Sequence, residues 1–160
     1  MHFLQFTIDD EHVLATDSLT ELFTWVDASY AVHDDRKSHA DGAMLFGRSV
    51  FDTKSTKQKL NTKSSTESEV VGVSYYLLSN IWVQNVWTRD GNDLEENTLY
   101  QNNTSAMKLE RNGWDSCGQK SRHIDIRYFW IKDRLKYEKN KLEYCPTELM
   151  LADFFTKPLQ

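Results

Sequence analysis

The sequence predicts an α/β fold, in which a mixed five-stranded sheet carries helices. Two patterns support this prediction. Residues 22–32 (LFTWVDASYAV) alternate between two faces as a strand does, with Phe23, Trp25 and Asp27 on one of them. From residue 64 the apolar residues instead recur with the period of a helix, and short strand-like segments then alternate with helical ones. Such a succession is typical of a sheet covered by helices.

The elements follow one another in the order β-β-β-α-β-α-α-β-α. The first three strands are predicted at 22–32, 43–51 and near 52–59, joined as antiparallel hairpins. A long helix is predicted at 64–87, where Val70, Val73, Leu77 and Ile81 form one apolar stripe. A strand at 98–101, helices at 104–111 and 123–139, a strand at 142–145 and a helix at 149–156 complete the chain. The later strands are expected to join the sheet in parallel.

Length and composition predict one domain. The chain has 160 residues, of which we assign 1–20 to a tail or connection and 21–160 to the domain. No apolar stretch approaches the roughly 20 residues of a transmembrane helix. A net charge of −5 disfavours a free-standing, highly basic nucleic-acid binder. Cys117 and Cys145 fit no metal or disulfide spacing, so we expect free thiols in a reducing, intracellular compartment.

Acidic residues lie where strands and helices are expected to meet. Asp27 interrupts an apolar strand, Glu67 and Glu69 fall in the first turns of the long helix, and Asp153 lies in the last helix. Helix capping, the helix dipole or plain exposure would each explain one of them alone. An Asp within an apolar strand is nevertheless costly unless it is compensated, and a cation is the natural compensation.

Five sequence blocks occur in order over residues 22–160: WVDASYAVH, KQKLNTKSSTESEV, LYQNNTSAMKLERNG, RHIDIRYFWIKDRL and YCPTELMLADFFTKPL. Together they resemble the ribonuclease H domain of copia-type LTR retrotransposon polyproteins. The resemblance implies a ribonuclease H-like fold and hydrolysis of the RNA strand of RNA·DNA hybrids during reverse transcription. It also implies two Mg²⁺ ions, for which Mn²⁺ can substitute.

The resemblance also implies four positions that are both catalytic and metal-binding. Asp27 and Asp153 match the first and last Asp of the family, and Glu69 matches its helix Glu, with Glu67 as the alternative. The third position is usually Asp, but this chain has Asn102. Two Mg²⁺ ions about 4 Å apart repel by roughly 17 kcal/mol at an effective dielectric of 20. Carboxylates offset this repulsion, so the loss of one carboxylate should weaken metal binding. We therefore expect Asn102 to weaken or abolish cleavage.

The origin of Asn102 is left open by the sequence. A deliberate exchange that permits substrate binding without cleavage is slightly favoured over natural decay, because the surrounding blocks look intact. The alternative function is a non-catalytic hybrid-binding or structural module that supports a reverse transcriptase. A transposase or integrase of similar fold is disfavoured, because its D…D…E order differs from the D-E-N-D order found here.

Several polar residues are expected to contact the hybrid. They are Ser29, Ser64, Ser65, Thr66, Asn103, Thr104 and His123, with the basic run Lys54, Lys57, Lys59 and Lys63 beside them. The expected partners are the hybrid and the reverse transcriptase domain of the same polyprotein, and no membrane. The isolated domain is expected to be a monomer in the cytoplasm or in a retroelement particle.

Overall fold

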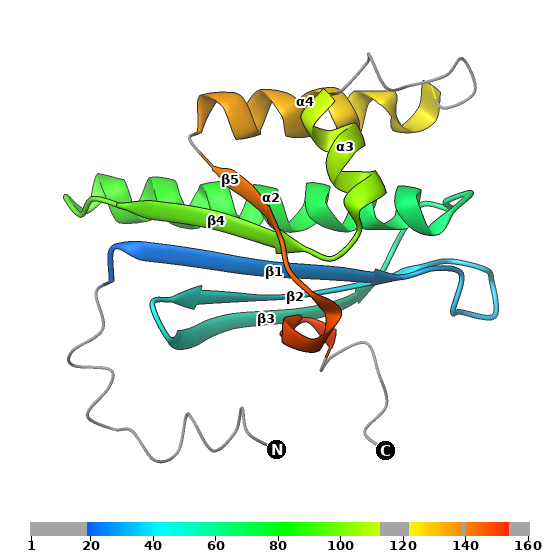
Figure 1. The fold of residues 1–160 in the computed structure, drawn as a ribbon, viewed down its shortest axis with the longest axis horizontal. Coiled ribbons are helices and arrows are strands. Elements are labelled where there is room, and N and C mark those ends of the chain that lie inside the picture. The colour runs from blue at the N-terminus through cyan, green and yellow to red at the C-terminus, as the bar shows by residue number, and fades with distance from the viewer. Residues whose placement is uncertain (1–18, 113–121, 139, 154–160) are drawn as a thin grey trace.

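A mixed five-stranded sheet forms the centre of the structure (Figure 1). The computed structural model describes residues 19–112, 122–138 and 140–153. Its strand order is β3-β2-β1-β4-β5, with β1, β2 and β3 antiparallel and β4 and β5 added in parallel to β1. The strands are β1 (Glu21–Ser29), β2 (His39–Phe46), β3 (Ser49–Lys57), β4 (Glu96–Gln101) and β5 (Lys141–Tyr144). The predicted fold class is confirmed.

The helices cover one side of this sheet, while the last turn of the described chain lies on the other (Figure 1). The helices are α2 (Ser65–Arg89), α3 (Thr104–Asn112) and α4 (Arg122–Tyr137), and η3 (Thr147–Leu149) is a single 3₁₀ turn. None of the helices in these described ranges is both long and apolar enough to cross a membrane.

Alternation along β1 sets the two faces of the sheet. Val26 and Ala28 face α2, where Gly72 lets the helix approach closely. Trp25 points the other way and stacks on Tyr100 of β4, next to the small cluster formed by the end of the chain. Asp27, two residues after Trp25, therefore lies on the face opposite α2.

Two predicted elements need correction. Residues 43–51 are not one strand, because the chain turns at Gly47 and Arg48 between β2 and β3. Gly47 adopts a φ of 54°, a left-handed conformation that glycine reaches without strain. The helix predicted at 149–156 is preceded by η3 and begins only at Asp153, after which the residues lie outside the described part. Residues 1–18 of the predicted tail also lie outside it.

A buried network of amides connects the helical layer to the parallel strands. The Asn80 amide group donates to Thr24 of β1 and to Asn97 of β4 at 2.9 and 2.8 Å. Asn97 in turn donates to Asn80 at 2.9 Å and to Asn140, just before β5, also at 2.9 Å. Since buried amides are stable only when hydrogen-bonded, this network fixes the position of β4 and β5 beside α2.

The close approach of α2 to the sheet gives a first prediction. A Cβ atom on Gly42 would lie 2.5 Å from the Tyr76 ring, so Gly42→Ala should destabilise the domain by about 1–3 kcal/mol. Gly72→Ala is the matched control, because its Cβ would meet Val26 at an ordinary 3.4 Å. It should be neutral or stabilising, because alanine favours a helix. Urea denaturation of both variants tests this prediction, and equal stabilities would contradict it.

Candidate functional site

Asp27 and Asn102 meet where β1 and β4 run side by side. The two strands are parallel, so residues that follow β4 lie beside the end of β1. Asn102 is the first residue after β4, and its Nδ2 atom donates a hydrogen bond to Oδ1 of Asp27 at 3.3 Å. Asp27 is buried, with 8% of its surface exposed. The residue that departs from the family pattern is therefore a direct partner of the first Asp.

Glu69 approaches the same place from α2. Burial is the largest cause that raises the pKa of Glu69 well above its usual value, and the charge of Asp27 is the second. The charge of Glu110 adds to this increase, while the Gln101 side chain and the Ala28 backbone lower the pKa in part. Oε2 of Glu69 is buried without a hydrogen-bond partner. Such an oxygen requires a proton or a cation.

Glu67, the alternative to Glu69, instead takes part in the helix cap. Its backbone N–H donates to the Ser64 side chain at 3.2 Å, and its carboxylate accepts from the Lys63 backbone at 2.7 Å. This arrangement is close to a capping box, which holds an acidic side chain at the start of a helix. The structure therefore holds Glu67 at the start of α2, whereas the Asp27 charge acts on Glu69, whose role as a ligand stays a prediction.

Asp153 lies on the face opposite α2, near the end of β5. Its backbone N–H donates to the Met150 carbonyl at 3.1 Å, and its charge adds to the burial that raises the pKa of the Cys145 thiol. The Cys145 backbone N–H donates to the carbonyl of Gln101, the residue before Asn102, at 2.9 Å. The segment just before Asp153 packs back onto the sheet, where Met150 and Ala152 meet Trp25 of β1 and Tyr100 of β4, and the joint ligation of Asp153 with Asp27 stays a prediction.

The donor chemistry fits a hard divalent cation. Carboxylates and an amide oxygen are ligands that Mg²⁺ accepts, and the unpartnered Oε2 of Glu69 is free to serve as one. Among the residues that the structure describes, no three His, Cys, Asp or Glu side chains come together as a metal site. Asn102 contacts Asp27 directly, and the charge of Asp27 acts on Glu69, so these three side chains are the candidate ligands that the geometry supports.

The predicted substrate-binding residues lie around this end of the sheet and at the starts of the helices. Ser29 ends β1, Ser64 caps α2, and Asn103 caps α3 by accepting from the Ser105 and Ala106 backbone at 3.1 and 3.0 Å. Ser65 and Thr104 are exposed, and Thr66 is half-buried. The His123 side chain lies outside what the structure describes.

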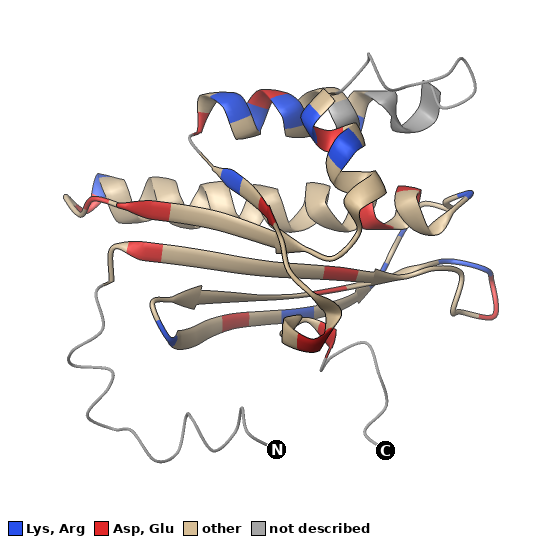
Figure 2. Cartoon of the chain, viewed as in Figure 1, with Lys and Arg blue, Asp and Glu red and all other residues tan. Residues whose placement is uncertain are grey.

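The predicted basic run occupies β3 and the loop that follows it. Lys54, Lys57 and Lys59 line a cavity of about 250 Å³ against Tyr75 and Tyr76 of α2. Figure 2 also shows Lys and Arg gathered on α4, interspersed with acidic residues. Lys54 is opposite Gly42 and so lies on the α2 side of the sheet, whereas Asp27 points to the other side.

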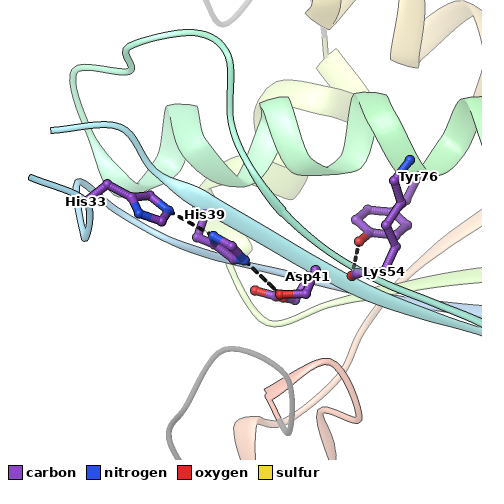
Figure 3. Close-up of polar contacts among 6 residues, drawn as sticks. His33, His39, Asp41, Lys54 and Tyr76 are labelled. Atoms are coloured by element: carbon purple, nitrogen blue, oxygen red, sulfur yellow. Dashed lines mark hydrogen bonds and ion pairs between the residues drawn. The ribbon is translucent and has the colours of Figure 1, made fainter. Parts of the chain in front are cut away.

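Two buried acids near the site had no signal in the sequence. Glu110 of α3 is fully buried, and burial raises its pKa to about 8, although the Gln101 side chain and the charge of Arg111 lower it in part. Asp41 of β2 is also fully buried, and it ends a line of polar side chains that runs from His33 through His39 (Figure 3). His33 and His39 are 2.9 Å apart, and Nε2 of His39 lies 3.5 Å from Oδ1 of Asp41.

The raised pKa of Glu110 predicts a pH-dependent stability. The folded state binds the Glu110 proton up to about pH 8, whereas an unfolded Glu releases it near its ordinary pKa of 4.5. This group should therefore stabilise the fold fully only below about pH 4.5, and its contribution should be lost as the pH rises to about 8. The loss is on the order of 5 kcal/mol at most.

Urea denaturation at pH 5 and pH 8 measures this loss. Glu110→Gln should make the stability less dependent on pH, whereas Glu143→Gln, at an exposed position of β5, should not. An unchanged pH dependence in Glu110→Gln would show that Glu110 is ionised in the folded protein.

Solved structures with the same fold are ribonucleases H. LC11-RNase H1, isolated from compost, superposes with a TM-score of 0.62 at 8% identity, covering 85% of this chain and 92% of its own. The RNase H domain of Mycobacterium tuberculosis rv2228c gives 0.59 at 8% identity, covering 85% and 93%. The foamy virus protease-reverse transcriptase gives 0.55 at 10% identity, covering 87% of this chain and 21% of that one. The chain has the ribonuclease H fold.

The sequence relatives are retrotransposon Pol polyproteins. The polyprotein of tobacco (Nicotiana tabacum) transposon TNT 1-94 is 28% identical over 124 residues, which are 78% of this chain and 9% of the relative. That of Arabidopsis thaliana transposon RE2 is 26% identical over 161 residues, covering 99% of this chain and 11% of the relative. No protein-family model matches the chain. The resemblance to a ribonuclease H domain of a retrotransposon Pol polyprotein is confirmed, and the chain spans about a tenth of the polyproteins it matches.

Proposed function

We propose that this chain is the ribonuclease H domain of a copia-type retrotransposon polyprotein, which hydrolyses the RNA strand of RNA·DNA hybrids. The observation that supports it best is the meeting of Asp27, Glu69 and Asn102 beside the end of β1. The ribonuclease H fold and the polyprotein relatives agree with it. The reverse transcriptase domain of the same polyprotein is the proposed partner, and the cytoplasm or a retroelement particle is the proposed location.

In this proposal Asp27, Glu69, Asn102 and Asp153 hold two Mg²⁺ ions, or Mn²⁺ in their place. Such ions activate the attacking water and stabilise the leaving oxygen of an in-line displacement. Asp27 and Glu69 supply full negative charges, whereas Asn102 supplies a neutral amide. Its Nδ2 also donates to Asp27 Oδ1, an oxygen that a ligand role requires. We therefore propose that Asn102 weakens cleavage.

Hybrid contacts are proposed for the residues that surround these acids. Hydroxyl and amide groups at the starts of α2 and α3 would bind phosphates and 2′-hydroxyls and so position the RNA strand. The proposed residues are Ser29, Ser64, Ser65, Thr66, Asn103, Thr104 and His123.

The alternative is a module that binds the hybrid without cutting it. Asn102 favours this alternative, because its amide group gives one Asp27 oxygen a hydrogen-bond partner without any cation. Both functions require hybrid binding, so only the cleavage of RNA separates them.

The test is cleavage of end-labelled RNA in a hybrid with Mg²⁺ over a long incubation. The chain should cut the RNA slowly, Asp27→Asn should abolish cleavage, and Asp90→Asn, after the end of α2, should leave it unchanged. Hybrid binding in chelator is measured beside it. Binding without any RNA cleavage would favour the non-catalytic module, and neither binding nor cleavage would overturn both.

A further inference from the structure

The pairing of β1 with β2 places a second Asp beside Asp27. In the antiparallel register Asp41 is directly opposite Asp27. Gly42, the next residue, faces Tyr76 of α2, so Asp41 points to the opposite face, which is also that of Asp27. Residues directly opposite in an antiparallel pair have Cβ atoms about 4.5–5.5 Å apart. The two carboxyl groups are therefore neighbours on one face of the sheet.

The Asp41 carboxylate has no protein partner that satisfies it. Its side chain has none of its surface exposed, and neither carboxylate oxygen has a hydrogen-bond partner among the described residues. Nε2 of His39, at 3.5 Å from Oδ1 of Asp41 (Figure 3), is too far for a strong hydrogen bond and lies closer to the Ser55 hydroxyl, at 2.8 Å. Burial raises the pKa of Asp41, and Ser55 and His39 offset this only in part.

Two like charges directly opposite each other destabilise a sheet, and burial increases the cost. A fold that keeps both carboxyl groups therefore needs either a proton on one of them or a compensating positive charge. Asn102 cannot provide it, since its amide is neutral, and Glu69 approaches Asp27 with a further negative charge. A divalent cation bound between Asp27 and Asp41 would compensate the repulsion between these two carboxylates.

We propose that Asp41 is a ligand of the cation site at Asp27 and supplies, from β2, a carboxylate charge that position 102 lacks. The proposal rests on the proposed function, because it takes the cation site at Asp27 as given. It predicts that this chain binds the cation nearly as well as a chain with Asp at position 102. Asn102 should therefore lower mainly the rate of cleavage.

Cation binding is measured by calorimetric titration with Mn²⁺, without any substrate. Asp41→Asn should weaken Mn²⁺ binding at least about tenfold, since the number of ligand charges controls affinity. Asp52→Asn is the matched control, because Asp52 lies on β3 opposite Met44, on the α2 side of the sheet. It should bind Mn²⁺ as the unchanged chain does.

A double variant that moves the carboxylate from position 41 to position 102 provides the decisive comparison. The double variant Asp41→Asn/Asn102→Asp returns the carboxylate to the family position, so it should regain the affinity that Asp41→Asn loses. If affinity stays low in the double variant, Asp41 acts through the fold and the proposal is wrong. Melting in chelator serves as a second measurement: Asp41→Asn should melt no lower than the unchanged chain, because a repulsion has gone, and a lower melting temperature contradicts the proposal.

Two further variants separate the possible failures. If Asp27→Asn loses Mn²⁺ binding and RNA cleavage but Asp41→Asn changes neither, the proposed function stands and this inference fails. If Asp27→Asn also changes nothing, the cation site itself is absent and the proposed function fails with it. If His39→Gln destabilises the fold as Asp41→Asn does, with unchanged Mn²⁺ affinity in both, Asp41 serves only to pair with His39.

Discussion

Asn102→Asp is expected to raise the rate of Mg²⁺-dependent RNA cleavage at least about a hundredfold, the typical effect of one electrostatic group that stabilises a transition state. The change replaces an N–H donor beside Asp27 Oδ1 by a carboxylate. It frees that oxygen for ligation and adds a full negative charge to the site. Because Asp41 would already support cation binding, the gain should appear in the rate at saturating Mg²⁺ rather than only in the Mg²⁺ concentration required.

The neighbouring residue offers a matched control for this experiment. Asn103→Asp is the same chemical change one position further on, at the cap of α3, where aspartate also serves as a cap. Single-turnover cleavage of an end-labelled hybrid should be accelerated by the change at 102 and not by the change at 103. Equal rates for Asn102→Asp and the unchanged chain would show that position 102 is not part of the metal site.

Local patterns in the sequence predict most of this fold, because each reports on one element. The stripe of Val70, Val73, Leu77 and Ile81 predicts α2, and all four of these residues are in the main hydrophobic core. The boundary between β2 and β3 was missed because the apolar run continues through Gly47 and Arg48. Only the left-handed conformation of Gly47 shows where the chain turns.

The candidate site was predictable only in part. The resemblance predicted Asp27, Glu69, Asn102 and Asp153, and parallel pairing of β1 with β4 explains why Asn102 reaches Asp27. It favoured Glu69 over Glu67, although both suit the first turns of a helix. The cap formed by Ser64 and Glu67 agrees with that choice, and the ligand role of Glu69 stays a prediction.

Asp41 could not have been found by this route. In the sequence it stands in a polar segment, HDDRKSHADG, that is typical of a turn. Its importance comes from the strand register, which places it opposite Asp27 fourteen residues earlier in the chain. Strand register depends on contacts between distant segments, and a local period of two residues does not specify it. Buried Glu110 gave no signal because its burial depends on how helix α3 packs against distant segments, which the local sequence does not specify.

The effect of Asn102→Asp on stability should depend on whether a cation is bound: the variant should be less stable than the unchanged chain without a cation and should regain stability with one. In chelator, Asn102→Asp should melt lower than the unchanged chain, because it replaces a hydrogen bond to Asp27 by a buried like-charge contact. A loss of about 2 kcal/mol corresponds to about 4–8 °C in a domain of this size. With Mg²⁺ at about a hundred times its Kd, ligand binding returns about 2.7 kcal/mol.

Melting curves of both proteins, each in chelator and in millimolar Mg²⁺, measure this reversal. Mg²⁺ should raise the melting temperature of Asn102→Asp more than that of the unchanged chain, since the variant has one more ligand charge. Asn103→Asp should respond to Mg²⁺ as the unchanged chain does, because a charge at the α3 cap adds nothing to the ligands of Asp27. If Asn102→Asp instead melts higher in chelator, residue 102 does not repel Asp27, and the short distance between their side chains has no energetic consequence.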